Sequence, residues 1–325
     1  MKIKLIAHGA LPIPPVDWGA VEGTLWHRKL HLERMGHTVD ISNSRAIDQA
    51  IDLANERAYD FVHCHNEDFV GPCVSHLKRP LAVTSHNGWL HAFDPDRDRP
   101  EKFGGLSSQF RETMRAPANF VLSERIRQLY VRGGYTGFLR VLRNAVEANE
   151  FRVVPRGNGK AVCVGRISRR KRQRMLFEIA RNRVRVDFVG PWRRELASDI
   201  VEHEHAAYLG VWDKPTLYER LGEYSCLALL SESEGAPKVV LEALAAGLSV
   251  VITEACAANL TDEEFITIIP DGETRPDTIA HAIQSAIDNN PPLRATIRDY
   301  AFRRFDYSVV VPEYVRLIEE YLSTR

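Results

Sequence analysis

Short apolar runs rich in β-branched residues recur along the 325-residue chain, six in each half, and most are separated by stretches with helical spacing. A continuous apolar run of four or five residues is typical of a strand that is buried on both faces. Strands are therefore expected at residues 4–7, 38–41, 60–64, 81–85, 119–123, 138–142, 161–165, 186–190, 206–210, 226–230, 249–253 and 265–269. The pattern predicts α/β domains whose parallel sheets are covered by helices.

For two helices, the sequence predicts both where the helix begins and where it ends. Residues 21–35 carry an apolar stripe at helical spacing, and Gly36 follows as a C-terminal cap. A second helix is expected over 237–246, with Pro237 at its first position and Gly247 directly after its end.

The strands and helices divide into two similar halves. The segment 155–160, rich in proline, glycine and charge, is the expected linker, so the predicted domains span 1–155 and 156–310. The final helical stretch, 311–325, has no strand after it and is expected to pack back on the first domain. Ligands of open parallel sheets bind beyond the carboxyl ends of the strands, so two such domains facing each other would form a central cleft.

Composition and charge narrow the range of functions. The 43 basic and 43 acidic residues balance, which argues against a general nucleic-acid-binding protein. The 5 cysteines form no C-x-x-C pair, which argues against a disulfide framework or a zinc site and favours a reducing cytoplasm. No apolar stretch approaches 18 residues, and the first apolar run is too short for a signal peptide.

The loop after the first strand ends at a glycine. It has no G-x-G-x-x-G fingerprint, which argues against a simple NAD enzyme. Gly19 directly precedes the helix expected over 21–35, and a glycine there lets phosphate oxygens approach backbone N–H groups. The alternative is a glycine that serves only the turn.

A basic stretch, VGRISRRKR (164–172), follows the first strand of the second half. Arg166 and Lys171 would stand at the carboxyl end of that strand, where two cations can hold a diphosphate. A nucleic-acid patch would require interleaved aromatic residues, which are absent. The other arginines here are interpreted as a solvated helix face: Arg169, Arg170, Arg172 and Arg174.

The stretch EGAPKVVLE (234–242) places two carboxylates around a helix start. Backbone N–H groups of Lys238 and Val239 would have no partner within the helix and would favour a phosphate. Glu242, about one and a half turns into the helix, could accept hydrogen bonds from a ribose diol, and Glu234 would lie where an attached sugar extends. The alternative is that Glu234 stabilises the helix dipole and Glu242 is incidental.

Together these stretches resemble the retaining glycosyltransferases of family 4, which have the GT-B fold of two Rossmann-like domains. The resemblance covers nearly the whole chain in order. It rests on PPVDWGAVEGTLWHRKLHLERMGHTV, DFVHCH, TSHNGW, LRNAVEANEF, VGRISRRK, SESEGAPKVVLEALAAGLSVV and FRRFDYSVVVPEYVRLIEEYL.

The resemblance implies a site for the donor diphosphate. Gly19 would face the diphosphate through its backbone, and Arg166 and Lys171 would hold it with their charges. Lys238 and Val239 would contribute backbone N–H groups.

The resemblance also implies contacts with the rest of the donor. His86 would contact the transferred sugar near the reaction centre through its ring or backbone, and Glu234 would bind the sugar hydroxyls. Glu242 would bind the ribose, and the base would lie against residues 210–214, which include Val211. The residues alone favour a turn residue at His86. His63 and His65 lie two apart on one strand face, which would suit a metal, but no third ligand is obvious.

The implied reaction is transfer of a sugar from a nucleoside diphosphate, with UDP or GDP expected, to an acceptor hydroxyl with retention at the anomeric carbon. It needs no metal or other cofactor. The acceptor would be a glycan, a lipid-linked sugar or a small molecule in glycan, polysaccharide or glycoconjugate synthesis. It would bind the stretch 87–115 of the first domain, for which the alternative is a polar loop without a ligand. The expected location is the cytoplasm, with peripheral contact at the inner membrane face.

Two other functions remain compatible with the sequence. A nucleotide-sugar epimerase can share this architecture, although it does not predict the paired glutamates around the helix. A sugar-nucleotide-binding protein without catalysis would bind the same donor. A phosphorylase is excluded because it would require a pyridoxal lysine and a much longer chain.

Overall fold

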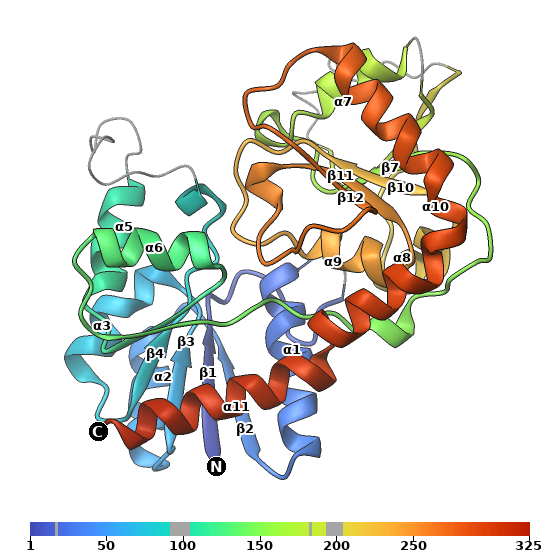
Figure 1. Ribbon diagram of the computed structural model, residues 1–325. Helices are drawn as coiled ribbons and strands as arrows, with labels where there is room; N and C mark the ends of the chain where they lie inside the picture. Colours follow the sequence, from blue (N-terminus) through green and yellow to red (C-terminus); the bar gives the residue numbers. More distant parts are fainter. Residues whose placement is uncertain (17–18, 92–104, 182–183, 193–203) are drawn as a thin grey trace. The chain divides into compact units, whose positions relative to one another are not determined.

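The computed structural model describes residues 1–16, 19–91, 105–181, 184–192 and 204–325 (Figure 1). Contacts divide the chain into two compact units, described separately below. Unit 1 comprises Met1–Asn144 and Tyr307–Arg325, and unit 2 comprises Ala145–Asp306. The segment expected as a linker, 155–160, thus lies within unit 2, and the last helix belongs to unit 1.

Unit 1 contains a parallel six-stranded sheet in the order β2-β1-β3-β4-β5-β6. Neighbouring strands pair in parallel register, with Ile3 of β1 opposite Val39 on one side and Phe61 on the other. The predicted runs of the first half all form strands of this sheet. Their bounds are β1 Lys2–Ala7, β2 Thr38–Asn43, β3 Phe61–Cys64, β4 Leu81–Val83, β5 Ala118–Val121 and β6 Phe138–Val141.

Helices cover both faces of the unit 1 sheet. The helix expected from residue 21 is α1, which lies beside α11, the last helix (Figure 1). The bounds are α1 Ala20–Arg34, α2 Ile47–Glu56, α3 Val70–His76, α5 Gly105–Met114, α6 Glu124–Arg132 and α11 Tyr307–Ser323, with short 3-10 turns η1 Glu67–Phe69 and η2 Gly88–His91.

Alternate side chains of β3 belong to different layers of unit 1. Val62 and Cys64 join the apolar cluster formed with α2 and α3. Phe61 and His63 lie on the opposite face, where both rings contact Tyr314 of α11. The period-two alternation of the strand therefore directs Phe61 and His63 toward the last helix.

Unit 2 repeats this architecture with the strand order β12-β11-β10-β7-β8-β9. The predicted runs of the second half all form its strands: β7 Ala161–Val164, β8 Val186–Val189, β9 Ala206–Tyr208, β10 Cys226–Leu229, β11 Ser249–Thr253 and β12 Ile266–Ile269. Its helices are α7 Gln173–Ala180, α8 Lys214–Arg220, α9 Lys238–Ala245 and α10 Pro276–Phe305, with 3-10 turns η3 Ala148–Glu150, η4 Arg169–Lys171, η6 Leu221–Glu223 and η7 Glu254–Cys256.

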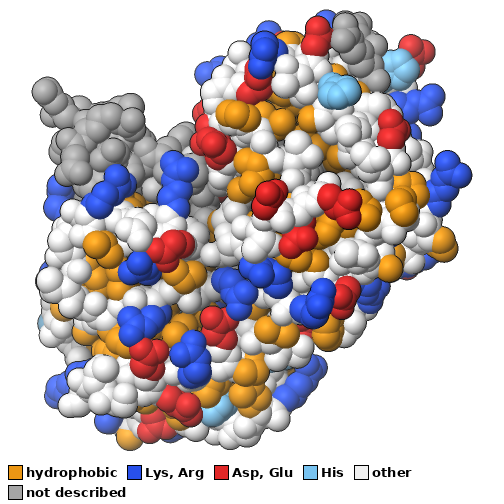
Figure 2. Space-filling view, in the orientation of Figure 1, with side chains coloured by type: hydrophobic (Ala, Val, Ile, Leu, Met, Phe, Trp, Pro, Cys, Tyr) orange, Lys and Arg blue, Asp and Glu red, His pale blue; other side chains and the backbone are white. Residues whose placement is uncertain are grey.

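The order of the unit 2 sheet positions two loops for chemistry. Strands β7 and β10 are hydrogen-bonded neighbours and run parallel, so the loops at their carboxyl ends lie at one edge of the sheet. The loop after β7 leads to Lys171, and the loop after β10 leads to Glu234. Basic and acidic side chains are interspersed over the face that Figure 2 shows, as the balanced charge predicts.

Candidate functional site

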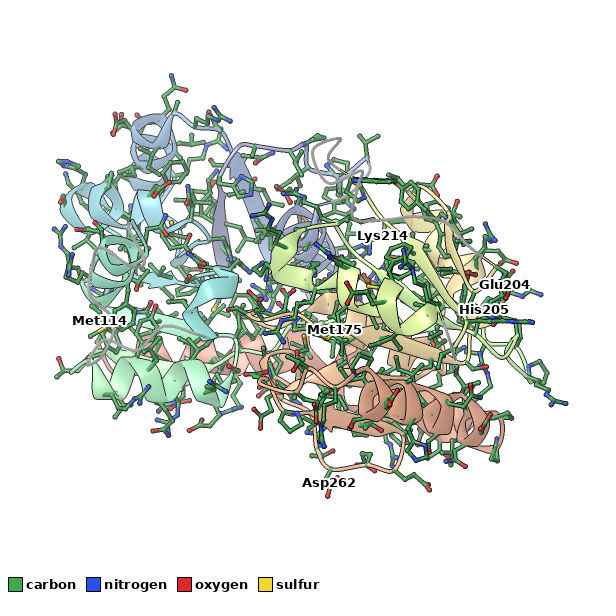
Figure 3. All side chains as sticks on the ribbon, turned by 90° about the horizontal axis from the view of Figure 1, so that it is seen from above. Met114, Met175, Glu204, His205, Lys214 and Asp262 are labelled. Carbon is green, nitrogen blue, oxygen red and sulfur yellow. The ribbon has the colours of Figure 1, made fainter. Side chains whose placement is uncertain are left out.

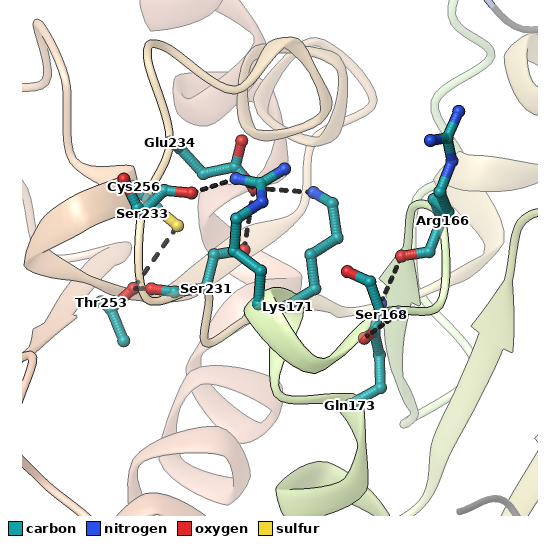
Figure 4. A network of polar contacts seen from close by, with 10 residues as sticks. Arg166, Ser168, Lys171, Gln173, Ser231, Ser233, Glu234, Thr253 and Cys256 are labelled. Atoms are coloured by element: carbon teal, nitrogen blue, oxygen red, sulfur yellow. Dashed lines mark hydrogen bonds and ion pairs between the residues drawn. The ribbon is translucent and has the colours of Figure 1, made fainter. Parts of the chain in front are cut away.

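Glu234 is a buried carboxylate at the end of the β10 loop. Only 8% of the surface of this residue is exposed. One oxygen, Oε1, accepts hydrogen bonds from Lys171 Nζ at 2.8 Å and from Ser231 Oγ at 2.9 Å (Figure 4). Arg170 Nη1 lies 3.2 Å from the same oxygen and also donates to the carbonyl of Ser233. Within the described part of the chain, no hydrogen bond or ion pair reaches the other oxygen, Oε2.

The charge of Glu234 depends on these partners. Burial alone raises the pKa of the Glu234 carboxyl, but the charges of Lys171 and Arg170, with the hydrogen bonds from Lys171 and Ser231, bring it below its ordinary value. The carboxyl is therefore ionised at neutral pH and acts only as an acceptor. A ligand group that binds Oε2 must donate a hydrogen bond, as a sugar hydroxyl does.

Backbone geometry at the end of β7 brings Lys171 to this carboxylate. Gly165 follows β7 with a φ of 150°, and a Cβ at this position would lie 3.3 Å from three side-chain atoms of Lys171. The η4 turn then directs the lysine back, and Lys171 N donates to the carbonyl of Ser168 at 3.1 Å. The glycine thus permits both the backbone conformation and the close approach of the lysine.

Arg166, the other predicted diphosphate ligand, does not join this group. Its side chain is exposed, and Figure 4 shows it apart from Glu234 and Lys171. The Arg166 carbonyl accepts a hydrogen bond from Gln173 Nε2 at 3.0 Å, which holds its backbone, and no described residue pairs with its guanidinium. The structure therefore brings Lys171 and Glu234 together, whereas the Arg166 side chain is exposed and lies apart from them.

The solvated interpretation of the other arginines is wrong for two of them. Arg170 binds Ser233 and Glu234 as described, and Arg172 pairs with Glu232 and donates to a backbone carbonyl. Arg174 is largely exposed, as expected. A helical spacing of residues could not predict these contacts, because the stretch forms a 3-10 turn followed by a residue in the left-handed conformation.

Glu242, the second predicted carboxylate, is paired with a lysine that the sequence did not indicate. Its Oε1 accepts from Lys214 Nζ at 2.5 Å, and only 6% of the residue is exposed. Burial raises the pKa of the Glu242 carboxyl, but the charges of Lys214 and Lys238 outweigh it and bring the pKa below the ordinary value. Glu242 is therefore also an ionised acceptor.

Lys214 is the first residue of α8, shown from above in Figure 3. Asp213 caps this helix by accepting from Thr216 N at 2.9 Å, which orients the first turn. Val211 lies in the preceding loop with an exposed side chain, next to the buried Trp212. The segment expected to receive the base thus also supplies the partner of Glu242.

The start of α9 corrects one expectation. The helix begins at Lys238, and Pro237 is its N-cap with extended backbone angles, rather than its first helical residue. Val240 N donates back to the Pro237 carbonyl at 3.2 Å. Lys238 and Val239 are the first two residues of α9, so their N–H groups have no acceptor within the helix.

Gly19 of unit 1 is the N-cap of α1. Its carbonyl accepts from Gly23 N at 2.8 Å, and a Cβ on Gly19 would lie 2.8 Å from a carboxylate oxygen of Glu22. Glu22 is buried and lies 3.0 Å from Nε2 of His8, which follows β1. A larger residue here would require the carboxylate end of Glu22 to shift, whereas the extended backbone of Gly19 does not itself demand a glycine.

His86 lies after β4 and contacts a second histidine. Its Nε2 is 3.0 Å from Nδ1 of the buried His65, and the two rings stack. The Nε2 atom of His65 has no hydrogen-bond partner among the described residues. A buried N–H without an acceptor is costly, so the proton of His65 belongs on Nδ1 and is donated to His86. Ligand contact by the His86 ring would then use an atom other than Nε2.

His63 has a defined tautomer within unit 1. Thr84 donates its single hydroxyl proton to the carbonyl of Phe120 at 2.6 Å, so Thr84 Oγ1 must accept from His63 Nε2 at 2.8 Å. Burial lowers the pKa of His63 far below its ordinary value, so the ring is neutral and its Nδ1 accepts from the Tyr314 hydroxyl at 2.8 Å. His63 and His65 do face one side, with ring centroids 4.0 Å apart.

The described residues contain neither a metal-binding cluster nor a membrane-spanning helix. Neither His63 and His65 nor any other described His, Cys, Asp or Glu side chains form a group of three that could hold a metal ion. Across residues 1–16, 19–91, 105–181, 184–192 and 204–325, no helix is long and apolar enough to cross a bilayer.

The predicted acceptor stretch, residues 87–115, is described in part. Residues 92–104, with Phe93, Arg97, Arg99, Lys102 and Phe103, lie outside the described part. From α5 on, the stretch is described, and it ends at Arg115, which pairs with Glu112 at 2.8 Å.

Comparison with protein families gives one match. The family model of the group 1 glycosyl transferases matches residues 158–289. This range contains Arg166, Lys171, Glu234 and Glu242. The match lies within unit 2, so this part of the chain is similar to the group 1 glycosyl transferases. A comparison with curated proteins gave no match.

Solved structures match the whole chain at low sequence identity. A sucrose-phosphate synthase (tll1590) from Thermosynechococcus elongatus is 15% identical with a TM-score of 0.80, and 100% of each chain is covered. Anabaena Alr3699/HepE in complex with UDP-glucose is 18% identical with a TM-score of 0.74, again over 100% of both chains. AviGT4, a glycosyltransferase involved in avilamycin A biosynthesis, is 17% identical with a TM-score of 0.75, covering 100% of this chain and 98% of that one. The fold is therefore GT-B, as predicted.

Proposed function

We propose that this chain is a retaining glycosyltransferase of family 4, which moves a sugar from a nucleoside diphosphate to an acceptor hydroxyl. The matched group 1 domain supports the class of enzyme. Anabaena HepE, which has the same fold, has been solved with UDP and with UDP-glucose, which supports a nucleoside diphosphate sugar as donor. UDP and GDP are the donor nucleotides that we consider first.

One observation carries the proposal. Glu234 and Glu242 flank the start of α9 as two buried carboxylates, each tied through Oε1 to a lysine. Oε2 of each carboxylate has no polar contact among the described residues. Two ionised carboxylates that can each accept hydrogen bonds from hydroxyl groups suit a ligand with two polyol parts, such as a sugar and a ribose. Glu242 is assigned to the ribose and Glu234 to the transferred sugar.

The diphosphate would lie between these two parts of the donor. The first N–H groups of α9, from Lys238 and Val239, favour negative charge at the helix start. Lys171 can move from Glu234 to a phosphate oxygen, and the exposed Arg166 can close on the diphosphate from the rim. We assign Gly19 and His86 of unit 1 to the diphosphate and to the sugar, respectively.

The proposed reaction is a front-face displacement. The bond between the anomeric carbon and the phosphate oxygen breaks, and the acceptor oxygen forms the new bond from the same face. The leaving phosphate takes the proton of the acceptor hydroxyl, so no protein base is required. Lys171, Arg166 and the start of α9 stabilise the charge that develops on the diphosphate.

The proposal includes no metal or other cofactor, because the cations of the chain neutralise the leaving group. The acceptor is proposed to be a glycan, a lipid-linked sugar or a small molecule that binds within residues 87–115. We further propose a cytoplasmic enzyme of glycan, polysaccharide or glycoconjugate synthesis, with peripheral contact at the inner membrane face.

The test is release of nucleotide from UDP-, GDP-, ADP- and dTDP-sugars in the presence of a chelator, first without and then with simple acceptor glycans. Wild type is compared with Glu242→Ala and with Glu219→Ala, which removes an exposed carboxylate paired with Arg152. We expect release of one nucleotide by wild type and by Glu219→Ala. In Glu242→Ala the KM for the donor should rise about 10- to 100-fold, because hydrogen bonds to a charged group are lost.

Other outcomes would contradict the proposal. Interconversion of two donor sugars without nucleotide release would identify an epimerase. Donor binding in calorimetry without turnover on any acceptor would identify a sugar-nucleotide-binding protein. Inversion at the anomeric carbon of the product, measured by proton NMR coupling, would refute retention alone.

A further inference from the structure

Two neighbouring cations share one oxygen of Glu234. Lys171 Nζ donates to Oε1 at 2.8 Å, and Arg170 Nη1 lies 3.2 Å from the same atom. One carboxylate therefore faces two positive charges, although a single lysine would neutralise it. The proposed function assigns Lys171 to the diphosphate, so Lys171 cannot serve both groups during turnover.

The two cations are held differently. Arg170 Nη1 also donates to the Ser233 carbonyl, and the Arg170 carbonyl accepts from Glu232 N at 2.8 Å. Arg170 is thus tied to the β10 loop through both its side chain and its backbone. Among the described residues, the ammonium of Lys171 has a polar contact only with Glu234. Lys171 can therefore leave, while Arg170 remains bound to the loop that carries Glu234.

We propose that Arg170 is a positioning residue that keeps Glu234 ionised and in place when Lys171 moves to the donor diphosphate. This inference rests on the proposed function of the site. Arg170 acts through Glu234 and does not touch the nucleotide. Arg170 supplies the positive charge that remains beside Glu234 in the donor complex.

The electrostatics of the loop explain why a second cation is needed. The charged or titratable groups that face Glu234 from the described elements are Arg170, Lys171 and, from η7, Cys256. Burial raises the pKa of the Cys256 thiol to about 11, so it supplies no charge at neutral pH. If Arg170 is absent and Lys171 departs, only Ser231 still donates to a buried carboxylate, which then takes up a proton.

The experiment measures binding of UDP, GDP, ADP and dTDP by calorimetry to wild type, Arg170→Ala, Glu234→Gln and the double variant. Each titration is made in two buffers of different ionisation enthalpy, which gives the number of protons taken up. Arg174→Ala is the matched control, because Arg174 lies on the same stretch with a largely exposed side chain. Thermal unfolding confirms that each variant is folded, and Arg170→Lys provides a variant that keeps the charge.

We expect Arg170→Ala to weaken nucleotide binding at least about tenfold at pH 7, which corresponds to about 1.4 kcal/mol. Its binding should be accompanied by proton uptake that wild type and Arg174→Ala lack. Arg170→Lys should restore most of the affinity. In the Glu234→Gln background, Arg170→Ala should have little further effect, because no buried charge remains to be matched.

Three outcomes would overturn the inference. Equal weakening by Arg170→Ala in both backgrounds would show direct contact of Arg170 with the nucleotide. If Arg170→Ala bound the nucleotide with wild-type affinity and took up no additional proton, Lys171 alone would suffice to keep Glu234 ionised. If wild type bound none of the four nucleotides, the proposed function would fail and the inference with it. Binding by wild type with no dependence of the Arg170→Ala effect on Glu234 would refute the inference alone.

Discussion

At the scale of single residues, Glu242 and Glu234 each pair with a lysine from another element, and this pairing determines the charge of each carboxylate. Lys214 and Lys171 hold Oε1 of the two carboxylates, so that each carboxylate is ionised despite its burial. The pairs are half-buried to buried, so loss of one partner leaves an uncompensated charge rather than a screened surface group. Removal of the lysine should thus alter the protonation of its glutamate.

Lys214→Met is expected to make nucleotide binding sensitive to mild acid. Wild-type Glu242 has a folded pKa below its ordinary value of 4.5, so its contribution is present above about pH 4.5 and is lost as the pH falls through the lower folded pKa. Without Lys214, burial shifts this loss to higher pH. Between pH 7 and 5 the dissociation constant of the nucleotide should rise more steeply in Lys214→Met than in wild type, because both proteins share the titration of the ligand's terminal phosphate. Identical pH profiles would contradict this, and Lys214→Arg serves as the control.

The β3 strand shows how one element combines a core role with a polar network. Val62 and Cys64 pack on the α2 and α3 side, while His63 connects Thr84 of the β4 end to Tyr314 of α11. His65, two residues on, contacts His86. The neutral, hydrogen-bonded His63 is therefore a structural link between strand and helix, and only its neighbour His65 touches a candidate site residue.

Acidification is expected to destabilise this element. Burial lowers the pKa of His63 and of His65 well below 6.5, so the unfolded chain binds protons that the folded chain does not. The free energy of unfolding should therefore fall as the pH drops below about 6.5, by up to about 1.4 kcal/mol per pH unit for each ring. Urea unfolding at several pH values measures this slope. It should be shallower in His63→Gln and unchanged in His281→Gln, which alters an exposed residue. A slope that stayed the same in His63→Gln would refute the assignment.

At the scale of the whole molecule, the chain leaves unit 1, completes unit 2 and returns. The helix α11 lies after all strands of unit 2, yet it belongs to unit 1 and lies beside α1. Its side chains Tyr314, Ile318 and Tyr321 are buried, and the two tyrosine rings contact Phe61 of β3. The core of unit 1 is thus completed only when the end of the chain has been made.

Removal of residues 307–325 is expected to unfold unit 1. Each fully buried large apolar side chain contributes about 1.5–3 kcal/mol, and several are lost, whereas a domain is stable by about 5–15 kcal/mol in total. Limited proteolysis with mass spectrometry should show rapid cleavage within residues 1–144 and slow cleavage within 145–306. Removal of residues 324–325 alone, which are exposed, should leave the pattern unchanged. Equal protection of unit 1 after the long deletion would contradict this expectation.

The sequence by itself determined the elements and their class, because strands and helices follow local patterns of apolar residues. Runs such as 226–230 and 249–253 became strands of parallel sheets, and the spacing of Glu234 and Glu242 follows from the start of α9 between them. Those features depend on residues that are close in the chain. Pro237 was misplaced by one position, because cap geometry depends on backbone angles that a pattern does not contain.

Only the tertiary structure decided which charges meet. Lys171 and Glu234 are 63 residues apart, Lys214 and Glu242 are 28 apart, and His63 and Tyr314 are 251 apart. These contacts depend on the strand order that places β7 beside β10, and on the return of α11 to unit 1. The same order places Arg170 beside the β10 loop, whereas the side chain of Arg166 is exposed. Periodicity along the chain contains no information on such pairs, because they form between elements after each has been built.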